Sequence, residues 1–470
     1  MGTALSKKEE AFRAFALNGP MGKVIVSVCA PLALYHSLNQ LFKILDAMMA
    51  AHISPSAVSA VSYLSQINLA LSALGSGLAV GASIKISEAY GAGDMELVKQ
   101  RVSTLFALCA GLGGLLLLIL VPCAVPFLRM MKTPEAFIHD GSRYFILDLF
   151  GLVITFFNNI YMAIQRARGA SGKILYLNMG AIGVKLGLTA WFVYGLGGGI
   201  DMIAVATILS QGLLFTVGMA DLGRKGSAFA FSLRSVSIRG TVVAPMVGLA
   251  FPVMVEKIAF SMGKVVVNSM STVYGALTVG ALGISNNIGG ITTTPQDGVQ
   301  EGGAAVISQN LGGGRPERAL SAFWWMLAVN VGIGTVIVSL VLLALTPISF
   351  FFAGDEPAFA EMIRQIYRYE ALGAVPLGVN AAVQGLLYGF GKTKLTLFIN
   401  FCRVFVFRIP VLWALQQFTS LGSVSVGIVM GVSNLSVGLL SLCIGLYEVW
   451  KIRRAYGLSA RVRRRAVSAG

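Results

Sequence analysis

The chain has 470 residues, of which 56% are hydrophobic and only 12% are charged. Soluble globular domains carry about 25% charged residues, so this composition excludes an ordinary soluble enzyme or binding module and indicates a protein embedded in a membrane. A basic face turned towards anionic lipid headgroups accounts for the net charge of +16, and we expect no nucleic-acid partner.

Apolar stretches long enough to cross the hydrocarbon layer, which takes about 20 residues, recur along the whole chain. In chain order they cover 22–51, 58–90, 98–128, 140–165, 174–196, 200–222, 241–271, 278–310, 319–352, 361–389, 393–416 and 423–450. The pattern predicts an all-α polytopic membrane protein with about twelve transmembrane helices. Pro31, Pro252 and Pro376 lie inside these stretches, where proline removes a backbone hydrogen bond and kinks a helix.

Lysine and arginine are distributed unequally between the segments that connect the apolar stretches. If the N-terminus is cytoplasmic, the segments on that side and the two chain ends hold 24 of these residues, whereas the opposite side holds only Arg129, Lys132 and Arg143. Basic residues accumulate on the cytoplasmic side of membrane proteins, so we predict that both termini are cytoplasmic.

The two halves of the sequence repeat one plan. A shift of 221 residues places Pro31 on Pro252, Gly77 on Gly298, Gly81 on Gly302, and the segment Gly91 to Asp94 on Gly312 to Arg315. A slightly shorter shift places Gly172 on Gly391. Each repeat holds six stretches, so both halves enter the membrane from the same side and are related by a pseudo-twofold axis along the membrane normal. We predict an N-terminal six-helix bundle at 1–222, a cytoplasmic linker at 223–240, a C-terminal six-helix bundle at 241–450 and a basic tail at 451–470.

Short motifs in a fixed order resemble those of the multidrug and toxic compound extrusion (MATE) transporters over about residues 22–450. The motifs are Pro31 to Asp46, Gly91 to Asp94, Gln165 to Gly172, Ala206 to Gln211, Gly298 to Gly302, Gln309 to Gly314 and Arg403 to Pro410. The resemblance implies a V-shaped pair of helical bundles in the cell membrane. It implies a secondary transporter, not an enzyme, that exports small organic molecules by alternating access in antiport with H⁺ or Na⁺. We expect a monomer in the lipid bilayer with no cofactor other than the coupling ion.

Ionisable residues inside apolar stretches are candidates for function, because each costs about 2.5–3.5 kcal/mol on insertion scales. Asp46, in the first stretch, matches the position of the family's coupling carboxylate, and Lys43 lies one helical turn before it on the same face. The resemblance therefore makes Asp46 a coupling residue, and we assign Lys43 to the substrate cavity. A static Lys43–Asp46 pair that only joins helices is the alternative.

The fifth stretch departs from the family pattern, whereas the sixth matches it. Lys185 and Thr189 stand where other members often carry Asn and Asp, whereas Thr207 matches the family's site threonine. A lysine near Asp46 would replace a bound Na⁺ with a tethered cation, which favours H⁺ as the coupling ion. We assign Lys185 and Thr207 to coupling and Thr189 to the cavity. A Lys185 side chain that extends to the membrane surface is the alternative.

In the second half, Glu256 lies four residues after Pro252, near the place where many members carry a functional glutamate. We assign Glu256 to coupling and Lys264 to the substrate cavity. An ion pair between Glu256 and a neighbouring lysine, which would lock the helix near a bend, is the alternative.

The eighth and eleventh stretches carry further charges. Asp297 and Glu301 are one turn apart, and we assign both to the substrate cavity, either as a second acid pair or as contacts to Arg403. Arg403 and Arg408 match basic positions of the family, and we interpret them as anchors between the bundles or towards lipid.

The histidines and the buried lysines bear on other possible functions. His36, His52 and His139 lack the spacing of a metal-binding motif, so no metal site is predicted. The excess of lysine in the apolar stretches leaves two alternatives to export of a cationic drug: a flippase for a lipid-linked precursor, or an exporter of an anionic metabolite.

Overall fold

The computed structural model describes residues 5–51, 55–130, 135–223, 227–354 and 356–458, without the side chains at 43–51, 55–66, 135–137, 139, 140, 200 and 276. Almost all of the described residues are helical, and none of them forms a β-strand. The predicted all-α fold class is confirmed.

The first half of the chain begins with a short helix and continues as six long helical segments. Its elements are α1 (Lys7–Asn18), α2 (Met21–Ala51), α3 (Pro55–Ala92), α4 (Met95–Leu120), α5 (Ala124–Met130), α6 (Glu135–Ala167), α7 (Ser171–Ala190), the π-helical turn η1 (Trp191–Gly195) and α8 (Ile200–Leu222). α1 begins with a capping box, because Ser6 and Glu9 each accept a hydrogen bond from the other's backbone N–H.

The second half repeats this order after a linker that contains the short turn η2 (Leu233–Ser235). Its elements are α9 (Gly240–Ser271), η3 (Thr272–Tyr274), α10 (Ala276–Gly312), α11 (Pro316–Leu343), α12 (Leu345–Ala353), α13 (Pro357–Ala371), α14 (Ala374–Gly389), α15 (Thr393–Phe401), the π-helical turn η4 (Cys402–Val406), α16 (Ile409–Phe418) and α17 (Val424–Ala455).

Ten of the described helical segments are long and apolar enough to cross a membrane, and the bent pair α13 and α14 makes an eleventh. α10 is 37 residues long and packs against α2, α3, α11 and α14, so it is the twelfth spanning helix. The prediction of about twelve transmembrane helices is confirmed. The bend between α13 and α14 measures 48° and falls at 372–373, where the ring of Pro376 clashes with the carbonyl four residues earlier.

Proline also divides two other predicted stretches. The stretch 98–128 is divided between α4 and α5, and the stretch 319–352 is divided between α11 and α12. Proline explains both divisions. Pro122 disfavours the helical conformation of the residue before it, and the ring of Pro347 clashes with the carbonyl of Leu343, the last residue of α11.

Equivalent turns in the two halves use equivalent glycines. Gly93 and Gly314, with φ of 86° and 68°, follow α3 and α10, and Gly169 and Gly391, with φ of 77° and 69°, follow α6 and α14. Glycine adopts this left-handed region without steric cost. The shift that pairs Gly172 with Gly391 is therefore wrong by three residues, because Gly172 lies in the first turn of α7.

Repeated glycines also bring the two halves together through reciprocal contacts. A Cβ atom on Gly91 of α3 would lie 2.0 Å from the carbonyl oxygen of Gln309 on α10, and one on Gly312 of α10 would lie 1.9 Å from the carbonyl oxygen of Glu88 on α3. The shift that relates Gly91 to Gly312 also relates Glu88 to Gln309. Two surfaces that contact each other reciprocally are related by a twofold axis, so the pseudo-twofold axis passes between α3 and α10.

The same reciprocity holds farther along these helices. A Cβ atom on Gly77 of α3 would lie 2.6 Å from the backbone of Met254 on α9, and one on Gly298 of α10 would lie 2.7 Å from the backbone of Ala33 on α2. Small residues allow helices to approach closely in membranes. The glycines of the repeat are therefore the contact points between the two halves.

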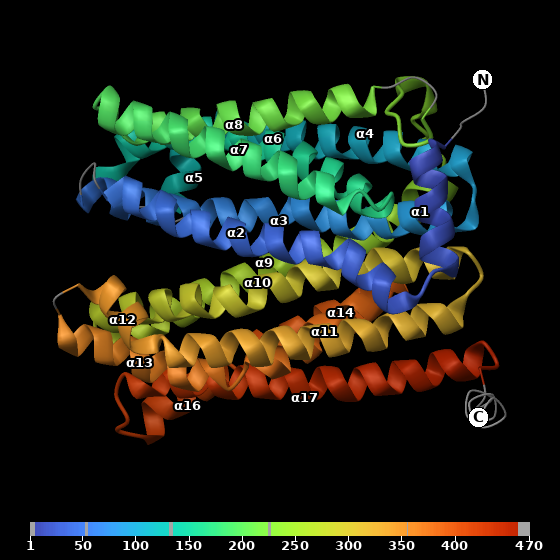
Figure 1. The fold of residues 1–470 in the computed structure, drawn as a ribbon. Helices are drawn as coiled ribbons and strands as arrows, with labels where there is room; N and C mark the ends of the chain where they lie inside the picture. Colours follow the sequence, from blue (N-terminus) through green and yellow to red (C-terminus); the bar gives the residue numbers. More distant parts are fainter. Residues whose placement is uncertain (1–4, 52–54, 131–134, 224–226, 355, 459–470) are drawn as a thin grey trace.

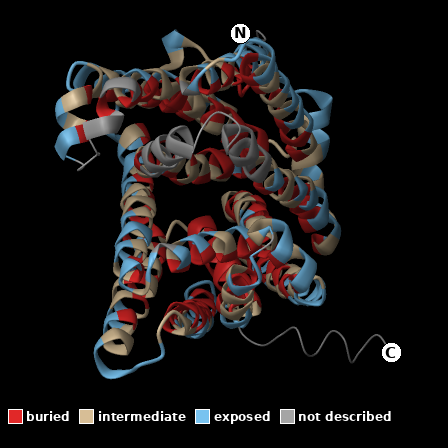
Figure 2. Cartoon of the chain, turned by 90° about the vertical axis from the view of Figure 1, so that its left-hand side faces the viewer, coloured by how far each residue is buried: buried red, intermediate tan, exposed pale blue. Residues whose placement is uncertain are grey.

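Figure 1 shows the helices of the first half, in blue to green, above those of the second half, in yellow to red. α1 lies across both halves at the end where α17 also finishes, and we call this end of the molecule the α1 end. The ribbons of the two halves converge at the α1 end and diverge towards the opposite end (Figure 1). In Figure 2, seen from that opposite end, buried residues gather on helix faces turned towards other helices.

Candidate transport site

A buried carboxylate on α9 is surrounded by neutral hydrogen-bond donors. Glu256 is 4% exposed. Its Oε1 accepts hydrogen bonds from the Tyr388 hydroxyl of α14 at 2.9 Å and from Nδ2 of Asn400 on α15 at 2.6 Å, and its Oε2 lies 2.6 Å from Oγ1 of Thr396 on α15. Burying an ionised carboxylate is tolerated when its oxygens are hydrogen-bonded or when it takes up a proton.

The hydrogen bonds of the Thr396 hydroxyl depend on whether Glu256 is protonated. Its Oγ1 lies 2.6 Å from Glu256 Oε2 and also 2.8 Å from the carbonyl oxygen of Thr393. A hydroxyl has one hydrogen to donate. When Glu256 is ionised, Thr396 shares this hydrogen between Glu256 and the Thr393 carbonyl. When Glu256 is protonated and donates to Thr396, the hydroxyl can give its own hydrogen wholly to Thr393, so both contacts become full hydrogen bonds.

An ion pair joins the two halves near the α1 end. Oε2 of Glu301 on α10 lies 2.8 Å from Nη1 of Arg166 on α6 and 3.6 Å from Nε2 of His36 on α2. A small cavity beside this pair is lined by Ser83 and Ser87 of α3 and by Tyr388, the partner of Glu256. The cavity therefore lies between the ion pair that joins the halves and Tyr388, which separates it from Glu256.

Asp297 lies one turn from Glu301 on the same face of α10 and is exposed. The charges of His36, Lys257 and Arg403 act on it electrostatically. The halves thus meet at Glu301, whereas Asp297, one turn farther from the α1 end, is exposed.

The second half also buries two arginines in its own interior. Nη2 of Arg403 donates to Oδ1 of Asn434 on α17 at 2.9 Å. Arg408, which is 3% exposed, donates to Oδ1 of Asn434 at 3.2 Å and to the hydroxyl of Ser433 at 3.1 Å. The interpretation of both residues as anchors between the bundles or towards lipid is therefore wrong, because their partners lie on α17 of the same half.

The interior of the first half holds a carboxylate on α6. Asp148 accepts a short hydrogen bond from Nδ2 of Asn68 on α3, and the charge of Lys185 on α7 acts on it electrostatically. Thr189, one turn after Lys185, is 1% exposed, and its hydroxyl has no partner among the described residues. Thr207 donates its hydroxyl to the carbonyl oxygen of Ile203 within α8.

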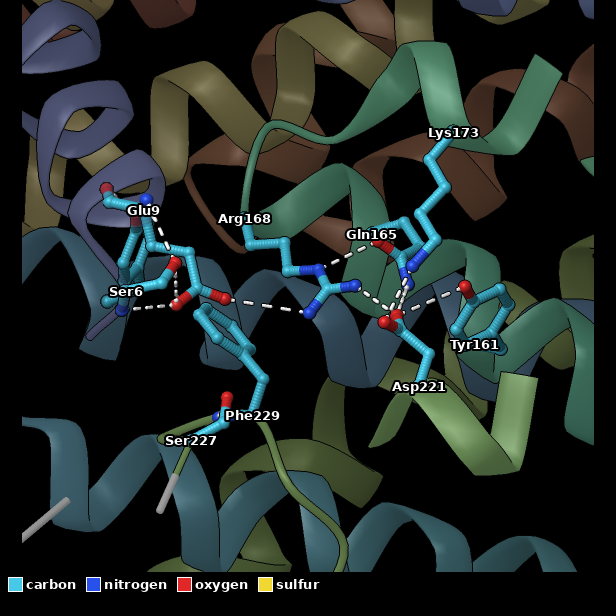
Figure 3. A network of polar contacts seen from close by, with 10 residues as sticks. Ser6, Glu9, Tyr161, Gln165, Arg168, Lys173, Asp221, Ser227 and Phe229 are labelled. Atoms are coloured by element: carbon cyan, nitrogen blue, oxygen red, sulfur yellow. Dashed lines mark hydrogen bonds and ion pairs between the residues drawn. The ribbon is translucent and has the colours of Figure 1, made fainter. Parts of the chain in front are cut away.

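A separate ionic network lies at the α1 end of the first half (Figure 3). Asp221, at the end of α8, receives bonds from Arg168, from Lys173 at 2.6 Å and from Gln165 at 3.0 Å. Arg168 also lies 3.5 Å from Oε1 of Glu9 on α1. The network connects the first helix of the chain to the turn between α6 and α7.

Comparison with known proteins identifies the fold's family. A family model described as MatE matches residues 31–191 and 252–414, which together cover more than half of the chain. The chain belongs to the MATE family. The matched segments cover most of the first five spanning helices of each half. The gap between them, 192–251, holds η1, α8, the linker and the start of α9.

Two curated relatives and one solved structure illustrate the similarity. "Probable multidrug resistance protein YoeA" of Bacillus subtilis is 23% identical over 90% of this chain and 92% of its own length. "Probable multidrug resistance protein NorM" of Thermotoga maritima is 22% identical over 92% of this chain and 93% of its own length. A structure titled as the outward-facing conformation of a multidrug resistance MATE family transporter superposes with a TM-score of 0.89 at 20% identity, covering 96% of this chain and 99% of that one. MATE proteins are transporters, so the prediction that this multi-pass membrane protein is not an enzyme is confirmed.

The predicted site residues of this MATE protein fall into separate groups. Glu256 lies inside the second half, Glu301 and Asp297 lie between the halves, and Lys264 lies 5.0 Å from the ring of Phe260 on α9. Glu301 binds Arg166 and not Arg403, and Arg403 acts on Asp297 through its charge while it donates a hydrogen bond to Asn434. The side chains of Asp46 and Lys43 lie outside the described residues, so the predicted pairing of Asp46 with Lys185 stays a prediction.

Several partners were missed by sequence reasoning. Thr396, Asn400 and Tyr388 were overlooked because neutral residues inside apolar stretches carry no signal that distinguishes them from packing residues. Arg166 and Asp221 lie at the ends of helices, where charged residues are common, and Arg166 is one of the 24 basic residues predicted on the cytoplasmic side.

Proposed function

We propose that this MATE protein exports small organic molecules from the cell in antiport with H⁺, and that Glu256 carries a proton during the cycle. The single observation that supports this most strongly is the contact set of Glu256, in which Thr396 shares one hydrogen between two acceptors while the carboxylate is ionised and gains a second full hydrogen bond when it is protonated. Transport by alternating access requires a group whose bound proton depends on which side is open.

The α1 end is the cytoplasmic end in this proposal. The basic residues of the helix ends gather there, including Arg166, Arg168 and Lys173, in keeping with the positive-inside rule. The molecule is closed at that end by Glu301–Arg166 and by the glycine contacts of α3 with α10, so its arrangement corresponds to an outward-facing state. A proton then enters from the outside and reaches Glu256 past Asp297 and Tyr388.

Proton coupling fits the Glu256 site better than sodium coupling. Sodium requires several oxygen ligands, whereas Nδ2 of Asn400 faces the carboxylate and donates an N–H to it at 2.6 Å. By family resemblance, Asp46 is a second coupling carboxylate in the first half, with Lys185 and Thr207 near it.

The test is transport of ethidium, an organic cation, by purified protein in liposomes with an imposed pH gradient or an imposed Na⁺ gradient. The pH gradient is expected to drive transport, and Glu256→Gln is expected to lower that transport at least tenfold. Glu317→Gln is the matched control, because Glu317 is exposed in the first turn of α11. Unchanged dependence of Glu256→Gln on the pH gradient would contradict the assignment of Glu256. A wild-type protein that responds to neither gradient would contradict antiport altogether.

A further inference from the structure

The two halves place a carboxylate at the same point of the repeat. α6 covers 135–167, and α13 with α14 covers 357–389, so both their first and their last residues are related by a shift of 222. This shift places Asp148 of α6 on Glu370 of α13. Neither residue belongs to the site assigned to coupling above.

The surroundings of the two carboxylates are also equivalent. Asp148 accepts a hydrogen bond from Asn68 of α3, and Glu370 accepts one at 2.5 Å from the Ser285 hydroxyl of α10, the equivalent helix. The residue equivalent to Asn68 is Gly289, whose Cβ atom would lie 2.7 Å from Glu370 Oε1. The longer glutamate thus occupies space in the second half that the asparagine side chain occupies in the first. The two sites keep one shape with different residues.

A basic residue from the fifth spanning helix of each half completes both sites. Lys185 of α7 acts electrostatically on Asp148. Arg408, just after η4, acts on Glu370, together with Arg403 and Lys264. A shift of 222 would place Lys185 on Phe407, one residue short of Arg408. A π-helical turn adds one residue to a helix, and η4 lies between the start of α15 and Arg408, so it brings Arg408 into the position of Lys185.

We propose that Asp148, with Asn68 and Lys185, forms a proton-binding site in the N-terminal half, equivalent to the Glu370 site in the C-terminal half. The inference rests on the proposed H⁺ antiport. Asp148 is only partly buried and receives its hydrogen bond from a neutral amide, so its carboxylate keeps acceptor sites that a proton can use. Lys185 supplies the cation that neutralises Asp148 when the proton leaves. In the part of the chain that the structure describes, Asn68 and Lys185 are the polar and charged groups that act on Asp148.

The test is the number of protons that enter per ethidium molecule exported, measured in liposomes from the pH gradient that just balances an opposing ethidium gradient. The wild-type ratio is expected to fall by one proton in Asp148→Asn and to be restored in Asp148→Glu, which keeps the carboxylate. Glu96→Gln on the exposed first turn of α4 is the matched control and is expected to keep the wild-type ratio.

A second measurement separates proton binding from a structural role. Lys185→Met is expected to move the pH dependence of ethidium transport towards higher pH, because the cation that competes with the proton is gone. Lys394→Met, on the exposed start of α15, is expected to leave it unchanged. An active Asp148→Asn protein with the wild-type ratio would overturn the inference and leave H⁺ antiport intact. Absence of pH-driven transport in the wild-type protein would instead overturn the proposed function itself.

Discussion

The charges at the α1 end of the first half and those in the core of the second half are neutralised in opposite ways. Asp221 is held by the opposite charges of Arg168 and Lys173, whereas Glu256 is held by the neutral donors of Tyr388, Thr396 and Asn400. A carboxylate between two cations stays ionised in every state, because losing its charge would leave both cations unpaired. A carboxylate among hydroxyl and amide groups can gain or lose a proton with little rearrangement. Two cations therefore hold Asp221 in one charge state, whereas the neutral partners of Glu256 leave it free to change state.

The largest loss of stability is expected from a substitution of Asp221. Asp221→Asn leaves Arg168, which is 11% exposed, without its strongest partner, and breaking a buried ion pair costs about 3 kcal/mol or more. We expect this substitution to lower thermal stability more than Glu256→Gln, Glu301→Gln or Arg13→Ala does, measured as the unfolding midpoint of the protein in detergent. The remaining folded protein is expected to keep pH-driven ethidium transport.

Glu256→Gln is the counterpart for this stability measurement, because it removes the charge but keeps the shape of the side chain. We expect its unfolding midpoint to stay close to that of the wild type. Normal stability with lost coupling in Asp221→Asn, together with the reverse in Glu256→Gln, would show that the contrast between the two regions is wrong.

The repeat explains why much of the fold was predictable from the sequence. The glycines at Gly77, Gly91, Gly298 and Gly312 stand out at one shift because close contacts between the halves allow no side chain there. Hydropathy gave the spans because a helix in lipid must be apolar over its whole length. Proline-induced breaks at Pro122 and Pro347 were missed because each falls where two apolar segments are too close together to be separated by hydropathy alone.

The candidate site was less predictable, because its contacts join residues far apart in the chain. Glu301 was recognised as a charged residue in a span, but its partner Arg166 comes from the other half. The equivalence of Asp148 and Glu370 is hidden in the sequence, since Asn68 corresponds to a glycine and Lys185 is displaced by the extra residue of η4. A fixed shift cannot detect a site whose shape is kept by compensating changes.

A change of intermediate size concerns the ion pair between the halves. Glu301→Gln removes the charge that Arg166 binds at 2.8 Å, and a hydrogen bond between charged groups contributes about 1.5–3 kcal/mol. Because this pair joins the halves near the α1 end, we expect the ratio of molecules open at that end to molecules closed there to rise about tenfold or more. The distance between spin labels at Glu96→Cys and Lys394→Cys, exposed positions in different halves, measures the opening. The exposed Cys123 and Cys443 are first replaced by serine.

An unchanged distance distribution in Glu301→Gln would mean that the glycine contacts of α3 with α10 alone close the α1 end. Gly312→Ala then tests those contacts directly, because its Cβ atom would lie 1.9 Å from the carbonyl oxygen of Glu88. The two variants separate closure by charge from closure by shape.

The smallest expected effect concerns α1, which is fastened to both halves. Arg13 donates to the carbonyl oxygens of Tyr90 at 2.8 Å and Gly91 at 2.9 Å in the first half, while Arg315 and Arg318 of the second half donate to the carbonyl oxygens of Leu17 at 2.7 Å and Gly19 at 2.7 Å. Arg13→Ala removes two hydrogen bonds between α1 and the first half but leaves the Glu9–Arg168 ion pair, and partly exposed hydrogen bonds contribute about 1 kcal/mol. We expect faster hydrogen exchange at the amides of α1, with exchange in α3 and α10 unchanged and transport kept within about threefold.

Arg13→Lys keeps the charge but not the two-pronged geometry, so the amides of α1 are expected to exchange at an intermediate rate in this variant. If Arg13→Ala instead opens the α1 end as widely as Glu301→Gln does, α1 itself keeps the two halves together. The ionic network of Figure 3, which includes Glu9 of α1, then contributes to closing the α1 end.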